Sequence, residues 1–478
     1  MTHTPDLRQA APGRAPHPIH WLVLTAALVG IKLAWLVADP TPMLFLGDSE
    51  SYVWTALTGW VPPDRSFVYG FLLRPLAVMP GSLLPLVVAQ AASSVVAALL
   101  LAHLLANAFA IPARAAFTVA LGWAALEPLA LLYERYVMTE AFALVGFAAF
   151  VTLSIRYLAL RRLRDLLLAQ VAATFVIALR TVFVPVALVF ALVLPVLAWA
   201  RRPSGGEAAS TRRGLGPALL VSITATLLLH QAYKVVNGRL SESPPAYQYT
   251  DGLFLLAAWS PVVSAQDFDD RAIGDAITAD SEYRQTNCGT REEQRWRKGC
   301  MVHDLVRLVG DDGRANPVAR NAAIRALRRD PLGVAGLAFA TWRAHFDRNA
   351  VHNAMHYDRG EFAFSARLIA TLRERFGVAE PAQLHRIATP TNRWYFAAVP
   401  WIIFLALAPF IAALALATCP KAARRKMTFV TLLSTCIIGA TAFGALGVVP
   451  RYLHAIAWLT MIPLTVIAAR IARAIRSG

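Results

Sequence analysis

Long apolar runs separated by short basic clusters dominate this chain of 478 residues. About 20 apolar residues are enough to cross a bilayer as a helix. Lipid offers no hydrogen-bond partner to an open backbone, so runs of this length predict helices. We predict ten membrane spans, at residues 20–38, 82–108, 115–133, 138–155, 165–179, 182–199, 215–235, 395–418, 427–447 and 453–469.

The composition indicates an all-α polytopic membrane protein. Hydrophobic residues make up 57% of the chain and charged residues only 16%, whereas a soluble domain carries about a quarter charged residues. The net charge of +17 comes from 46 basic and 29 acidic residues. Much of this excess lies in clusters between the apolar runs, which is typical of topology signals and of contact with anionic headgroups. We therefore expect membrane lipids, and no nucleic acid, among the partners.

The basic clusters also predict an orientation. With the N-terminus in the cytoplasm, the short inside segments carry 18 basic residues and the short outside segments carry 5, which are Arg65, Arg74, Arg135, Arg180 and Arg451. Cytoplasmic loops of membrane proteins are rich in Lys and Arg. We therefore expect both termini in the cytoplasm, and the first span to be a retained helix and no cleaved signal. The Ala- and Arg-rich composition points to a bacterial inner membrane.

The spans divide the chain into three parts. Residues 1–235 form an N-terminal transmembrane module, residues 236–393 a mainly helical extracytoplasmic segment between spans seven and eight, and residues 394–478 the C-terminal transmembrane helices. Spans five and six meet near Arg180, for which we predict a tight outward hairpin with this residue at its tip.

The outside loop at 39–81 and the long outside segment both carry predicted short helices. In the loop, 51–60 and 68–78 are suited to the headgroup layer. In the long segment, 253–263 is too short to span and predicts a buried or interfacial helix. A helical pattern at 317–346 is interrupted at the Asp330-Pro331 pair.

Two of the four cysteines lie in the outside segment. A disulfide can persist there, so we predict a bridge between Cys288 and Cys300; the alternative is two unpaired thiols in a flexible loop. Cys419 and Cys436 fall at the inner face and within a span. No second pair or histidine spacing completes a four-ligand zinc site.

Three acidic residues gather at the outer membrane face. Asp48 and Glu50 follow the first span, and Glu140 lies at the mouth of a later one. An ionisable residue at the membrane is expensive unless it is paired or functional. On the same face lie arginines that can fork onto a phosphate, among them Arg180 and Arg451. A carboxylate base opposite a phosphate-binding cluster suits transfer of a group away from a lipid phosphate.

Three motifs, in this order and on one side, resemble the GT-C superfamily of polyprenyl-phosphate-dependent membrane glycosyltransferases, such as the protein mannosyltransferases and aminoarabinose transferases. They are Gly47-Asp48-Ser49-Glu50-Ser51-Tyr52 after the first span, Met138-Thr139-Glu140 before a later span, and Pro450-Arg451-Tyr452-Leu453-His454 before the last span. The match covers mainly 20–200 and 394–478. The large outside segment between spans seven and eight departs from the relatives, whose large domain follows the last span.

The resemblance implies a reaction and roles. Asp48 would be the general base for an acceptor hydroxyl that attacks the sugar with inversion, while a polyprenyl phosphate leaves. Glu50 and Glu140 would complete the catalytic acids, with Glu50 orienting the acceptor or binding a metal; we expect no metal and no other cofactor. The residues that would bind substrate are Lys32, Tyr52, Arg65, Arg180, Arg451, Tyr452 and His454. The acceptor, whether lipid, glycan or protein, is left open.

Each assignment has a structural alternative. Those alternatives are an N-cap for Asp48 on a helix that begins near Ser51, a solvated first-turn acid for Glu50, an ion pair with Arg135 for Glu140, a topological anchor for Arg180, snorkelling to headgroups for Arg451 and Lys32, and a packed core position for His454. His352 and His356 lack the acid that a metalloprotease motif places between its histidines.

Two other functions remain open. A transporter or flippase of a lipid-linked or anionic substrate would place its acids on discontinuous helices at the bilayer midplane. A non-catalytic assembly subunit would tolerate the loss of Asp48.

Overall fold

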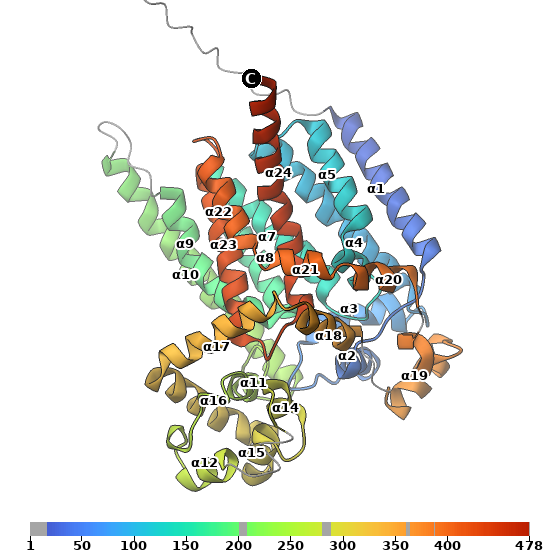
Figure 1. Ribbon diagram of the computed structural model, residues 1–478, viewed down its shortest axis with the longest axis vertical. Helices are drawn as coiled ribbons and strands as arrows, with labels where there is room; N and C mark the ends of the chain where they lie inside the picture. The colour runs from blue at the N-terminus through green and yellow to red at the C-terminus, as the bar shows by residue number, and fades with distance from the viewer. Residues whose placement is uncertain (1–16, 200–207, 280–287, 360–363, 387, 478) are drawn as a thin grey trace, which may run out of the picture.

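A computed structural model describes residues 17–199, 208–279, 288–359, 364–386 and 388–477. Within these ranges the regular structure is helical, apart from one isolated parallel bridge between Met43 and Tyr136. The predicted all-α class is therefore confirmed. Figure 1 shows a bundle of long helices with the C-terminus at one end and a group of shorter helices at the other.

In the part of the chain that the structure describes, seven helices are long and apolar enough to cross a membrane. They are Pro18–Ala38 (α1), Leu84–Ala108 (α4 with η2), Glu140–Leu160 (α7), Thr181–Trp199 (η3 with α9), Gly214–Leu240 (within α10, Ala208–Leu240), Arg424–Gly444 (α23) and Pro450–Arg476 (η6 with α24). Val399–Leu405 (α21) and Ala408–Thr418 (α22) add an eighth span if the pair, bent by 58°, crosses as one. The chain is thus an all-helical polytopic membrane protein.

The predicted count of ten spans is not confirmed. The third predicted span is divided into Ala113–Leu126 (α5), of 14 residues, and Pro128–Tyr133 (α6). Pro128 cannot donate a backbone hydrogen bond to continue α5, and Glu127 instead caps α6 by accepting from the Ala130 N–H at 2.5 Å. The fifth predicted span, Leu163–Leu179 (α8), has 17 residues. Helices α5 and α8 are therefore both shorter than the seven long helices described above.

The predicted hairpin at Arg180 is present. Helix α8 ends at Leu179, Arg180 has an extended backbone, and the chain turns through Thr181–Phe183 (η3) into Val184–Trp199 (α9). Helix α8 packs closely on α7, where a Cβ on Gly146 would lie 2.7 Å from the Phe175 ring. The absence of a side chain at Gly146 allows the two helices to approach.

The long outside segment has a small core of its own. Its helices include Asp251–Ala258 (α11), Arg271–Thr278 (α12), Arg291–Trp296 (α14), Met301–Val309 (α15), Asp312–Arg329 (α16) and Pro331–Ala344 (α17), with Ala265–Asp267 (η4) between α11 and α12. Leu253, Leu256, Leu305 and Val334 are buried together in it. The helix predicted at 253–263 is confirmed in part, since α11 ends at Ala258. The predicted break at Asp330-Pro331 is confirmed: Asp330 ends α16 and caps α17 by accepting from the Gly333 N–H at 2.7 Å.

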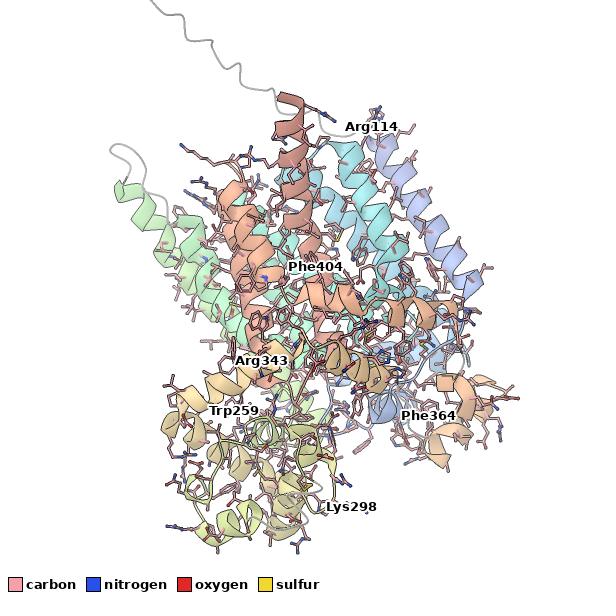
Figure 2. The ribbon with its side chains drawn as sticks, viewed as in Figure 1. Arg114, Trp259, Lys298, Arg343, Phe364 and Phe404 are labelled. Carbon is pink, nitrogen blue, oxygen red and sulfur yellow. A yellow bond between two sulfur atoms is a disulfide. The ribbon has the colours of Figure 1, made fainter. Side chains whose placement is uncertain are left out.

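The segment is fastened internally and to the bundle. Cys288 is joined to Cys300 in a disulfide, with Cα atoms 5.7 Å apart. The Trp259 indole donates to the Phe443 carbonyl at the end of α23, at 3.0 Å. Figure 2 shows Trp259 close to the bundle and Lys298 far from it, while Arg114 lies at the opposite end of the bundle.

The first outside loop contains Leu46–Thr58 (α2), Phe67–Leu73 (α3) and the wide turn Arg74–Val78 (η1). The two predicted interfacial helices are thus found, but α2 begins five residues before the predicted start at Ser51. Between α17 and α21 the described residues form four more short helices: Arg348–Arg359 (α18), Ala366–Phe376 (α19), Pro381–Arg386 (η5) and Pro390–Ala397 (α20). Helix α19 packs against the loop through Leu368, Leu372 and Phe376.

The charge bias and the fold together predict that the end of the bundle with the shorter helices is extracytoplasmic and that the end with the C-terminus is cytoplasmic. In a chain with Cys419 and Cys436 replaced by Ser and the disulfide retained, a cysteine at Ala276, exposed on α12, should react with a membrane-impermeant maleimide in intact cells. A cysteine at Ala472, exposed near the end of α24, is the matched control and should react only after the membrane is opened. The reverse pattern would contradict the predicted orientation.

Candidate active site

The first outside loop is fixed to the turn between α6 and α7. The Met43 N–H donates to the Arg135 carbonyl at 2.7 Å, and the Val137 N–H donates to the Met43 carbonyl at 2.8 Å. The Ser49 hydroxyl adds a contact from inside α2: it accepts from the Phe45 N–H at 2.7 Å and donates to the Val137 carbonyl at 2.9 Å. These bonds fix the first turn of α2, on which Asp48 lies, against the mouth of α7.

Asp48 is held by two arginines, Arg65 from the same outside loop and Arg451 from the turn before the last span. Its Oδ1 lies 2.5 Å from an Arg65 guanidinium nitrogen, and its Oδ2 lies 3.1 Å from one of Arg451. Burial by itself would raise the pKa of the Asp48 carboxyl, but the charges of Arg65 and Arg451 outweigh it and hold the pKa below its usual value. The side chain remains 24% exposed. Asp48 is therefore an ionised carboxylate that other molecules can reach.

The capping alternative for Asp48 is wrong. Helix α2 begins at Leu46, and the residue in the N-cap position is Phe45, which makes no side-chain capping bond. Asp48 lies inside the first turn, where the helix dipole favours a negative charge. Its two oxygens contact arginine side chains from other parts of the chain.

Glu140 is the first residue of α7 and forms an ion pair with Arg180. The carboxylate is almost fully buried, and the Arg180 side chain is 11% exposed. The alternative pairing of Glu140 with Arg135 is wrong: Arg135 is buried, lies 3.3 Å from a Glu134 oxygen and donates to the Asp39 carbonyl at 2.8 Å.

Tyr452 lies between the two acid–arginine groups. The Arg180 guanidinium carbon is 4.8 Å from the centre of its ring, and that of Arg451 is 5.6 Å away. Cation–π contact at these distances is favourable. Arg451 also lies 4.6 Å from the centre of the Phe45 ring. Aromatic faces thus hold both guanidiniums in place beside the carboxylates.

A small cavity of about 20 Å³ opens among these groups. Its lining includes Glu140, Arg180, Arg451, Tyr452 and His454. This volume is enough for about one water molecule. The His454 ring is buried 5.3 Å from the ring of Tyr133, and among the described residues its Nε2 has no hydrogen-bond partner. The cavity therefore combines two cations, a carboxylate and an unused ring nitrogen.

Tyr52 lies next to the acids and belongs to the same group. It is buried on α2, with its ring 4.8 Å from that of Tyr69. Burial raises the pKa of the Tyr52 phenol well above its usual value, so the hydroxyl keeps its proton and can donate a hydrogen bond. Eight predicted residues thus gather at one place: Asp48, Tyr52, Arg65, Glu140, Arg180, Arg451, Tyr452 and His454.

Two predicted site residues have other partners. Lys32 is buried, lies 2.6 Å from a Glu134 oxygen and donates to the Ala124 carbonyl at 2.7 Å. The snorkelling alternative for Lys32 is therefore wrong, and a phosphate would have to displace a buried ion pair. Glu50, two residues from Asp48, lies on another face of α2 and accepts from the Ser365 hydroxyl at 2.7 Å.

The structure adds two aromatic residues that the sequence did not indicate. Phe45 supports Arg451, as described above. Tyr357 on α18 lies with its ring 6.3 Å from that of Phe45. Burial, together with a hydrogen bond to Glu292, raises the pKa of the Tyr357 phenol. Phe45 precedes the acidic motif by only a few residues, but no local pattern singles out Tyr357. Within the described ranges, no group of three or more His, Cys, Asp or Glu could hold a metal.

Comparison with known proteins gives low similarities. The sequence matches no family profile and no curated protein. Among solved structures, ArnT from Cupriavidus metallidurans bound to undecaprenyl phosphate is 14% identical, with a TM-score of 0.35 over 95% of this chain and 79% of ArnT. Arabinosyltransferase EmbB from Mycobacterium smegmatis is 14% identical, with a TM-score of 0.33 over 97% of this chain.

This chain covers 43% of the length of EmbB. The similarity to ArnT and EmbB extends over most of this chain.

The position of Lys32 predicts a structural role. Lys32→Met should lower the free energy of unfolding by about 3 kcal/mol, because breaking a buried ion pair leaves its partner charged and desolvated. Adding Glu134→Gln should not recover this loss, because it also removes the carboxylate that pairs with buried Arg135. Thermal denaturation of the single and double variants measures both effects. Weaker binding of polyprenyl phosphate by a Lys32→Met protein of normal stability would instead assign Lys32 to the phosphate.

Proposed function

We propose that the chain is an integral membrane glycosyltransferase that moves a sugar from a polyprenyl-phosphate donor to an acceptor at the extracytoplasmic face. The observation that carries this proposal is the meeting of Asp48 and Glu140 with Arg65, Arg180 and Arg451 at one end of the bundle. A carboxylate is a base for a hydroxyl, and arginines bind phosphate oxygens in pairs. Both components of the transfer are thus side by side.

The proposed reaction is a single displacement. Asp48 takes the proton of the acceptor hydroxyl while that oxygen forms a bond to the anomeric carbon of the sugar. The bond from this carbon to the phosphate oxygen breaks, its electron pair stays on the polyprenyl phosphate, and the configuration inverts. Arg180 and Arg451 stabilise the phosphate as it leaves. Tyr452 keeps the two guanidiniums in position.

Donor binding would also activate the base. A carboxylate with a low pKa is a weak base, and general-base catalysis is most effective with a pKa near the working pH. The Arg451 nitrogen that contacts Asp48 is the one a phosphate oxygen would compete for. When Arg451 turns to the phosphate, Asp48 loses a stabilising charge and its pKa rises. The acceptor is then deprotonated only when the donor is present.

The location of the acids disfavours a transporter. A transporter of the type considered above places its ionisable groups on broken helices at the bilayer midplane. Here Asp48 is in the first turn of a short helix outside the spans, and Glu140 is the first residue of α7. Their position suits a substrate that presents its headgroup at the membrane surface.

The role of Asp48 predicts the effect of one conservative substitution. Asp48→Asn should lower transfer by about 10²- to 10⁴-fold, because the amide keeps the size of the side chain but cannot accept the proton. Glu50→Gln, two residues away but bonded to Ser365, is the matched control and should retain most activity. Transfer from a set of polyprenyl-phosphate sugars is measured in membranes at equal expression. Near-normal transfer by Asp48→Asn would exclude it as the base, and an inactive Glu140→Gln beside it would move the role to α7.

The arginines predict the strength of donor binding. Arg451→Ala should weaken binding of polyprenyl phosphate by about ten- to a hundredfold, since a hydrogen bond to a charged group contributes about 1.5–3 kcal/mol. Arg180→Ala should have a similar effect. Arg74→Ala removes an exposed outside arginine and should leave binding unchanged. Affinity is measured on purified, folded protein. If all three variants bind polyprenyl phosphate as tightly as the wild type, Arg180 and Arg451 have only a structural role.

A further inference from the structure

Helix α17 of the outside segment has an apolar face that the other described residues leave uncovered. Leu332 is 82% exposed and Phe339 is 60% exposed, and Ala335 and Gly336, on the turns between them, are exposed as well. Residues three, four and seven apart share one face of a helix. Val334, on the opposite face, is buried in the core of the outside segment. The helix therefore has two apolar faces, and only one of them is packed.

The neighbouring helix α16 has the opposite kind of surface. Its exposed residues include Asn321, Arg325 and Arg328, whereas Arg343 is the one charged residue within α17. Both helices belong to the same segment, and their buried faces enter the same core. Because large exposed apolar patches mark contact with a membrane or a partner, the two exposed faces suit different surroundings. The face of α16 suits water, and the face of α17 suits a less polar medium.

The apolar face of α17 continues onto the surface of the membrane bundle. Helix α17 packs against the span α23, and Figure 1 shows it between α16 and the bundle. The Trp342 indole donates to the Ala406 carbonyl, at the bend between α21 and α22, at 3.1 Å. The Trp342 ring lies 5.6 Å from that of Phe339 and 6.1 Å from that of Phe410. Phe410 is 60% exposed on the apolar helix α22, so an aromatic strip joins α17 to a surface that faces lipid.

Basic side chains lie at both ends of this face. Arg328, three residues before α17, and Arg343, in its last turn, are both exposed. Figure 2 shows Arg343 where the outside segment meets the bundle. Arginines beside an apolar helix face suit anionic lipid headgroups, and tryptophans such as Trp342 are enriched in the same layer of the bilayer. Charge and aromatic placement thus favour lipid over a protein partner at this face.

We propose that α17 is an interfacial membrane helix that lies along the bilayer surface on the side of the candidate site. Leu332, Ala335 and Phe339 enter the boundary between headgroups and acyl chains, and Arg328 and Arg343 contact lipid phosphates. The outside segment is then bound to the membrane along one helix and is in water elsewhere. This interaction is separate from the proposed sugar transfer and does not depend on it.

Membrane contact at α17 also holds the part of the outside segment that faces the site. Thr341, on the buried side of α17, accepts from the Arg291 guanidinium of α14 at 2.6 Å. Glu292, the next residue of α14, is hydrogen-bonded to the Tyr357 phenol beside the site. Helix α14 is thus connected to the interfacial helix by one side chain and to the surroundings of the site by the next.

The experiment measures the membrane depth of α17 in the full-length protein, in nanodiscs of phosphatidylethanolamine and phosphatidylglycerol. Cys419 and Cys436 are replaced by Ser, the disulfide is retained, and a nitroxide is attached after Ala335→Cys. Asn321→Cys on α16 is the matched control. Oxygen concentrates in hydrocarbon, whereas a nickel chelate stays in water. We expect the ratio of oxygen to nickel collisions to be about tenfold higher at Ala335 than at Asn321, because only Ala335 lies among acyl chains.

Equal ratios at the two positions would place the face of α17 in water and overturn the proposal. A label at Ala335 that neither reagent reaches would also overturn it, because a second copy of the chain or another protein would then cover the face. Phe339→Glu should lower the ratio at Ala335 toward that at Asn321, since a charge is costly in the bilayer. Ala276→Glu, on the exposed side of α12, should leave it unchanged. If the Phe339→Glu protein does not fold, the two labels in the otherwise unchanged chain decide.

Discussion

A buried ion network around Glu134 holds the first span against the turn that carries the site. The Glu134 carboxylate is in contact with Lys32 at 2.6 Å and with Arg135 at 3.3 Å, and Arg135 reaches back to the Asp39 carbonyl at 2.8 Å. Charges in such a position are tolerated only when they are paired. The end of α1 and the turn after α6 are therefore fixed to each other, and the loop that begins at Asp39 starts from a fixed point. This fixed start places Met43 and Ser49 where they can bond to Tyr136, Val137 and their neighbours in the turn after α6.

The catalytic group proposed here depends on the same arrangement of charges. Asp48 is paired with Arg65 and Arg451, and Glu140 with Arg180, so their charges are compensated in a poorly solvated region. In the proposed reaction, an incoming phosphate would exchange one anionic partner of an arginine for another. Such an exchange requires little reorganisation, because the guanidiniums are already supported by Phe45 and Tyr452.

Much of this arrangement could be predicted from the sequence, because it depends on local patterns. Apolar length predicts the long spans, the Asp330-Pro331 pair predicts the break between α16 and α17, and charged residues at span ends on one side predict that Asp48, Glu140 and Arg451 meet. The failures come from contacts between distant residues. Pro128 and the capping bond from the Ala130 N–H to Glu127 divide the apolar run 115–133, which the sequence predicts to be one span. Helix α2 starts early, so Glu50 turns toward Ser365 while Asp48 faces the arginines.

Lys32 and Tyr357 show the same limit. Nothing near Lys32 in the sequence indicates that its partner is Glu134, 102 residues away. Tyr357 reaches the site because α18 packs beside the turn at Pro450–Leu453 (η6), and that packing depends on the whole path of the outside segment. Hydrophobic periodicity shows only approximately which residues share a face of a helix. Whether Asp48 or Glu50 faces the arginines depends on the face of α2 on which each acid lies.

The early end of α5 has a consequence for the surrounding lipid. Fourteen residues make a helix about 21 Å long, against a hydrocarbon core about 30 Å thick. The Trp394 indole donates to the Leu126 carbonyl at 2.7 Å and the Trp401 indole to the Glu127 carboxylate at 3.0 Å, so α20 and α21 lie where α5 stops. Hydrophobic mismatch of this kind is relieved by local thinning of the bilayer. We expect the headgroups to come closer to the membrane centre on this side of the protein, so that the phosphate of the proposed donor would meet the protein with its long tail still in the hydrocarbon.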